Sequence, residues 1–211
     1  MTLGTDDMSA RGAFDVVVRV VAGLLIAGVA TLGLAGSAQA TKQVSPEAYA
    51  TAVCGAVATL HTRTQAAEAP VKAATQAYKD QPSEATATAL RQALVTYLQQ
   101  AKANFGTTVK AFQKAGAPAV KNGENFATAL NQNLRTALAA LDPVIRTAGA
   151  IDVTSTTGFA AGAQKVFDQL DAASNVSKKQ ARQTAAFQHV SAALRPIVSY
   201  VKGSSDTCPG K

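Results

Sequence analysis

The chain of 211 residues contains no tryptophan, two histidines, two cysteines and 5% aromatic residues. Neither His61 nor His189 has a carboxylate or a cysteine at the spacing of a metal ligand, and neither belongs to the Glu-x-x-His motif of di-iron bundles. The sequence also lacks a phosphate-binding glycine loop, a nucleophile elbow and an HExxH motif. These absences leave no credible catalytic pair. We therefore expect a protein that is not an enzyme and has no cofactor and no metal site.

Basic residues outnumber acidic ones, 20 to 13, which gives a formal net charge of +7. They are spread along the whole chain, and the adjacent pair Lys178 and Lys179 is the densest group after residue 40. A nucleic-acid-binding surface typically has a basic stripe with aromatic side chains for stacking. The pattern thus argues against nucleic acid as a partner. Two readings stay open, contact with an anionic partner such as phospholipid headgroups or a wall polymer, and a charge that only favours solubility.

Residues 1–40 have the pattern of an export signal. Arg11 and Arg19 precede an apolar run over residues 20–34, and the small residues Ala38 and Ala40 predict cleavage after Ala40. A retained membrane anchor is the alternative, although the run is shorter than the roughly 20 residues of a spanning helix. Residues 41–211 then form a single domain that we expect to be secreted or associated with the cell envelope.

The rest of the chain has the apolar spacing of an all-α protein, with apolar residues recurring every three or four positions. Pro70 predicts a kink or a short break in the first helix. Asp142 and Pro143 indicate either a kink or a new helix start, and the last helical region is either one bent helix or two. The expected helices span residues 46–78, 83–115, 124–148 and 158–202, with an interruption near 175–178, where Ser177 and Gln180 have capping-box spacing.

Cys54 and Cys208 are the two cysteines, and in an exported protein such a pair typically forms a disulfide rather than two free thiols. A disulfide would bring their Cα atoms within about 7 Å, so the tail would lie beside the first helix. A chain that begins and ends at the same end of an antiparallel bundle makes an even number of passes. This favours an antiparallel (up-down) four-helix bundle with a kinked or broken fourth helix. Five helices stay open if the last two segments form a short hairpin.

The export signal, Cys54 early in the first helix and Cys208 near the end of the chain occur together with the stretch "AGAPAVKNGENFATAL" (residues 115–130), which contains a turn of the form Gly-x-Pro-x-Val-x-x-Gly before the third helix, and with a loop and a fourth helix of spaced Phe, Val and Leu. Together these features resemble small secreted or envelope-associated helical-bundle proteins of actinobacteria, whose function is uncharacterised. The resemblance implies the location and the fold, and it brings no catalytic residues.

Two hypotheses about function follow. The first is a non-enzymatic exported helical protein that binds an anionic envelope component or a partner protein. The second is a carrier of a small apolar ligand or haem in the bundle core. Its candidate cofactor-binding residues are His61 and His189, since each neighbours an apolar stripe.

Overall fold

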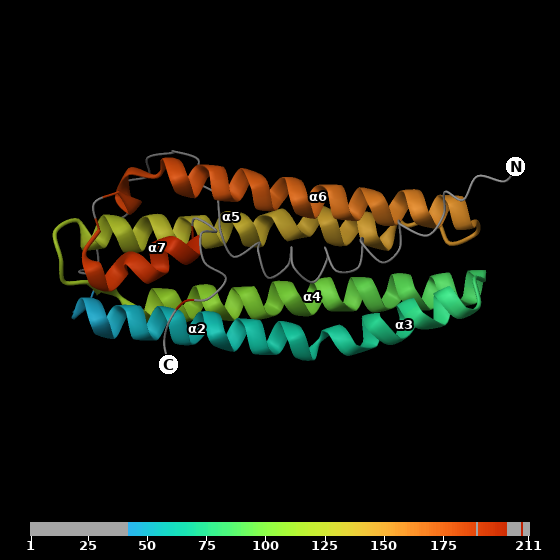
Figure 1. Cartoon of the computed structure of the whole chain (residues 1–211), viewed down its shortest axis with the longest axis horizontal. Helices are drawn as coiled ribbons and strands as arrows, with labels where there is room; N and C mark the ends of the chain where they lie inside the picture. The colour runs from blue at the N-terminus through green and yellow to red at the C-terminus, as the bar shows by residue number, and fades with distance from the viewer. Residues whose placement is uncertain (1–41, 189, 202–207, 209–211) are drawn as a thin grey trace, which may run out of the picture.

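The structure is a computed structural model that describes residues 42–188, 190–201 and 208, with backbone only for residues 176–183, 200 and 201 (Figure 1). The expected export signal in residues 1–40 and the candidate residue His189 lie outside the described residues.

The described chain is all-α apart from one pair of two-residue strands, as expected. β1 (Gln43–Val44) and β2 (Ala117–Pro118) pair in parallel. The helices are α2 (Pro46–Ala66), α3 (Glu68–Asp80), α4 (Glu84–Ala115), α5 (Gly123–Gly149), α6 (Thr156–Gln183) and α7 (Arg195–Val201), with 3-10 turns η1 (Ala185–Phe187) and η2 (Ala192–Leu194) between the last two.

The long helices lie side by side along one axis of an elongated molecule (Figure 1). α4 packs against α2, α3 and α5, and α5 also packs against α6. After α6 the chain turns back, so that η1 packs on α5, whereas η2 and α7 pack on α2. Within the part of the chain that the structure describes, no helix is both long and apolar enough to cross a bilayer.

The first arm divides at Ala67, before the proline that predicted its break. α2 ends at Ala66 and α3 begins at Glu68, which makes Pro70 the third residue of α3. The first backbone N–H groups of a helix have no intrahelical acceptor, so a proline there costs no hydrogen bond. Ala67 keeps helical dihedrals (φ −79°, ψ −8°), and the arm therefore bends without reversing.

The last arm breaks later than expected, because α6 continues through residues 175–178 to Gln183. The side-chain amide of Asn175 donates to Asp171 at 2.8 Å, one turn back on the same helix. The residues that follow are mostly good helix formers, which favours continuation. The expectation of an interruption at 175–178 was wrong, and the chain leaves the helix at Thr184 (φ −70°, ψ 114°).

α5 is continuous through Pro143. Asp142 was a candidate cap for a new helix, but its carboxylate accepts from Lys102 of α4. Asp142 therefore takes part in an ion pair that joins α4 to α5, and no new helix begins at this position.

Two apolar clusters fill the interior, one in each half of the molecule. The first combines α2, the end of α4 and the start of α5 with η1, η2 and α7, and includes Tyr49, Val53, Phe105, Phe126, Leu130, Phe187, Leu194 and Ile197. The second combines α3 and the start of α4 with the end of α5 and the start of α6, and includes Leu94, Tyr97, Leu98, Leu141, Val144, Phe159, Val166 and Leu170. The bent first arm contributes to both clusters.

A disulfide joins Cys54 of α2 to Cys208, with the Cα atoms 5.3 Å apart. The predicted bond is confirmed, and it holds the end of the chain against the first helix. It spans 154 residues, and in the chain-entropy model a loop of that size stabilises the fold by at most roughly 5 kcal/mol. Such a bond is typical of proteins that fold in an oxidising compartment.

Candidate functional site

The start of α2, the end of α4 and the start of α5 lie at one end of the molecule, and α7 packs on α2 (Figure 1). The segments at or next to these element ends carry five exposed basic residues. We call this surface the basic end and define it by Lys42, Lys110, Lys114, Lys121 and Arg195. Among the described residues, the exposed acidic side chains at this end are Glu47 and Glu124. The opposite end is mixed, with Lys79 and Arg146 beside Asp80, Glu84 and Asp152. The charge is therefore distributed unevenly along the long axis.

The pairing of β1 with β2 brings Lys42 next to the end of α4. The carbonyl oxygen of Lys42 accepts the Ala117 N–H at 2.9 Å, and that of Val44 accepts the Ala119 N–H at 2.7 Å. Gly116 makes the close approach possible with φ of 84° and no Cβ facing Lys42. Lys110 and Lys114 lie one turn apart on α4, so they share a face next to this junction.

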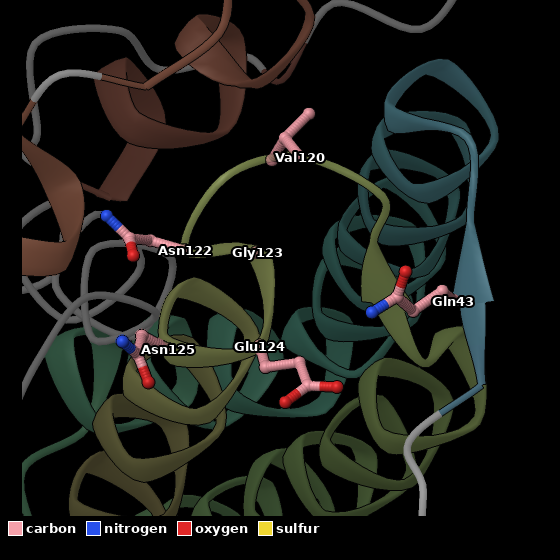
Figure 2. A pocket seen from close by; sticks show the side chains of 6 residues that line it. All are labelled: Gln43, Val120, Asn122, Gly123, Glu124 and Asn125. Atoms are coloured by element: carbon pink, nitrogen blue, oxygen red, sulfur yellow. The ribbon is translucent and has the colours of Figure 1, made fainter.

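A shallow hollow of about 330 Å³ lies within the basic end, between β1 and the start of α5 (Figure 2). Gln43 and Glu124 point toward each other across it, whereas Asn122 and Asn125 lie on the other side of the helix start. Its lining residues are Gln43, Val120, Asn122, Gly123, Glu124 and Asn125. Val120 is the one aliphatic side chain among them, so this hollow is not the apolar container that a carrier would need.

The start of α5 fixes the shape of the hollow. Asn122 takes a left-handed conformation (φ 62°), and its carbonyl accepts the Phe126 N–H at 3.0 Å. The Gly123 N–H donates to the Val120 carbonyl at 2.9 Å, which closes the turn. A Cβ at Gly123 would overlap the carbonyl oxygen of Pro118, so only glycine fits. The turn thus places Lys121 in the chain between Val120 and Asn122, two residues that line the hollow.

The sequence-predicted site residues lie elsewhere. His61 is exposed on α2, outside the apolar clusters, and His189 is not among the described residues. In the described part of the chain, no group of three or more His, Cys, Asp or Glu side chains is arranged to hold a metal ion. The structure therefore does not place a described histidine in the core, and the carrier hypothesis stays a prediction.

Two buried tyrosines have the most perturbed acid–base properties. Tyr49 and Tyr97 are 0% and 2% exposed, and among the described residues neither hydroxyl has a hydrogen-bond partner. Burial raises the pKa of both phenols well above the ordinary 10.0, and the nearby Glu68 carboxylate adds to the rise at Tyr97. Both tyrosines therefore stay neutral in the folded protein at a pH where an unfolded chain would ionise.

We expect the two tyrosines to make the protein alkali-sensitive. Above pH 10 the unfolded state releases phenol protons that the folded state retains, so stability falls as the pH rises. The loss approaches about 1.4 kcal/mol per pH unit for each tyrosine. Urea denaturation between pH 8 and 12 measures it. The variant with Tyr49→Phe and Tyr97→Phe should lose stability less steeply, and an unchanged slope would contradict the assignment.

Comparisons of the chain with protein-family models, curated proteins and solved structures found no match. The arrangement of the described residues is therefore the basis for an inference about function.

Proposed function

We propose that this protein is an exported, non-enzymatic helical bundle whose basic end binds an anionic component of the cell envelope. The arm formed by α2 and α3 together with α4, α5 and α6 would serve as the four passes of an up-down scaffold. The observation that carries the proposal is the gathering of five exposed cations at one end.

These cations are available to a partner. Within the described part of the chain none of the five forms an ion pair, whereas two other lysines do. Lys72 pairs with Glu68, and Lys102 pairs with Asp142, both away from the basic end. Lys114 also lies in the last turn of α4, where a cation is favoured by the helix dipole. Its charge contributes to stability as well as to recognition.

An anionic surface is the partner that this charge distribution fits best. A lysine held close to an anionic membrane surface contributes about 1 kcal/mol of attraction. Lys110 and Lys114, one turn apart on α4, act together, since physiological salt screens a charge only over roughly 8–10 Å. The mixed charges of the opposite end give no comparable attraction. We therefore expect the molecule to bind by one end, with its long axis pointing away from the surface.

A charge-neutralised variant tests this orientation. Changing Lys110, Lys114 and Lys121 to Gln should weaken binding to vesicles of anionic phospholipid or to purified wall polymer about a hundredfold, from roughly 1 kcal/mol per lysine. Sedimentation with these ligands at low and high salt gives the affinity. Binding of the wild type should also fall as salt rises.

The matched control changes Lys79, Arg146 and Lys165 to Gln, which removes the same charge from exposed positions outside the basic end. Its affinity should stay within about threefold of the wild type, because a Debye length of roughly 10 Å isolates these residues from the surface. Equal losses in the two variants would show that net charge alone drives binding. Absence of binding to envelope fractions at every salt concentration would refute the proposal.

A further inference from the structure

The segment after α6 is built differently from the rest of the molecule. It comprises residues 184–201, which we call the strap, and it consists of η1, η2 and the short helix α7 (Figure 1). Extended residues join the turns, with ψ of 114° at Thr184, 152° at Gln188 and 156° at Ser191. The backbone dihedrals of these extended residues can change without breaking the hydrogen bonds of a long helix. The strap can therefore move separately from α6.

The strap is held by side-chain packing on two helices. Phe187, Leu194, Ile197 and Val198 are at most 7% exposed and belong to the first apolar cluster. The Phe187 ring packs edge-on against Phe126 of α5, with centroids 5.4 Å apart. η2 and α7 pack on α2. The strap therefore covers apolar side chains of α2 and α5 at the basic end.

The chain that carries the strap is held covalently on both sides. Gln183 joins the strap to α6, and beyond residue 201 the chain is fixed to α2 by the bond from Cys208 to Cys54. Cys54 is 2% exposed, whereas Cys208 is half-buried. A reductant therefore reaches the Cys208 sulfur first.

We propose that the Cys54–Cys208 bond is a redox latch, whose reduction by an extracytoplasmic dithiol oxidoreductase releases the strap and uncovers the apolar surface of α2 and α5. A reductant thiolate attacks the Cys208 Sγ, the disulfide breaks, and Cys54 leaves as a thiolate that takes up a proton. The second reductant thiol then attacks the mixed disulfide, which frees the Cys208 thiol. The reductant ends as a disulfide after giving two electrons and two protons.

Release is local because the two apolar clusters are separate. Among the strap residues whose side chains the structure describes, none belongs to the second cluster, which the central helices α4 and α5 share with α3 and α6. Those helices keep their mutual packing when the strap leaves. Non-covalent contacts must then offset the ordering of the whole strap, because without the bond its link to α6 is the one covalent tether that the described residues show.

Hydrogen exchange of the exported chain, with the bond intact and after treatment with dithiothreitol, tests the latch. Amides of η1 and η2 should exchange at least about a hundredfold faster after reduction. In the oxidised protein they exchange only when the whole fold opens, whereas in the reduced protein the strap can open alone. Amides of α4 and α5 should stay at least about tenfold better protected than those of the strap in the reduced protein, because they still exchange only when the whole fold opens, although loss of the 154-residue loop lowers that stability too. The Cys54→Ser, Cys208→Ser variant should match the reduced protein without reductant and should not respond to it.

A second measurement tests the direction of attack. A dithiol oxidoreductase whose second cysteine is replaced by serine should become trapped on Cys208, as identified by mass spectrometry. Unchanged exchange of the strap after reduction would overturn the proposal. So would equal protection of the strap, α4 and α5 in the reduced protein, because the bond would then stabilise only the fold as a whole and would not hold the strap separately. Trapping on Cys54 would refute the order of attack and the accessibility argument with it.

Discussion

The Phe126→Ala variant is expected to unfold with a free energy about 3–5 kcal/mol below that of the wild type. Phe126 is 2% exposed and lies between two aromatic rings, with Tyr49 of α2 at 6.1 Å and Phe187 of η1 at 5.4 Å between centroids. Its removal leaves a cavity where α2, α5 and the strap meet. Against a typical stability of about 5–15 kcal/mol, this loss leaves the fold marginal.

Urea denaturation of the oxidised protein, followed by circular dichroism, gives this difference. Phe167→Ala on α6 is the matched control, since Phe167 is half-buried beside the second cluster. The same truncation there should cost less than half as much, because less apolar surface leaves the core. Equal costs at the two positions would mean that Phe126 does not have the central packing role assigned to it.

The helices could be predicted because caps and apolar spacing are local features of the sequence. The disulfide could be predicted because the chain has two cysteines and therefore one possible pairing. The Ser83 hydroxyl accepts the Thr86 N–H at 3.2 Å as an N-cap of α4, and Gly116 follows its last residue. Two cysteines in a chain with an export pattern leave one pairing. The breaks in the arms were harder to place. Pro70 suits either the first turn of a helix or a kink within one, and Ser177 suits either the start of a helix or its interior. Local sequence does not decide between these positions, and packing of the whole fold does.

The basic end could not be predicted because its residues are far apart in the sequence. Lys42 precedes α2, Lys114 ends α4, and Arg195 begins α7. They come together through the pairing of two-residue strands and through the return of the chain after α6. A strand of two residues has no periodic pattern, so the sequence gives no signal for it. The i, i+4 pair Lys110 and Lys114 was the part that local spacing could have indicated.

The junction of β1 with β2 also depends on Gly116, and the Gly116→Ala variant should lose about 4 kcal/mol of stability. At φ of 84° a side chain adds backbone strain of about 1–3 kcal/mol. The new Cβ would also overlap the backbone carbonyl oxygen of Lys42, and overpacking of this kind costs about 1–3 kcal/mol more. Because that oxygen is the acceptor of the Ala117 N–H, β1 must move away from β2.

Gly106→Ala within α4, the helix that ends just before Gly116, is the control, because a Cβ there would meet no atom within 4 Å. It should stabilise the protein by roughly 0.5–1 kcal/mol, through the lower conformational freedom of alanine in the unfolded chain. Urea denaturation of both variants gives the comparison. Folded Gly116→Ala protein should also bind anionic vesicles more weakly than Gly106→Ala protein, because Lys42 moves with β1 away from Lys114. Equal stability of the two variants would show that β1 tolerates displacement at no cost, and the junction would then not be what positions Lys42.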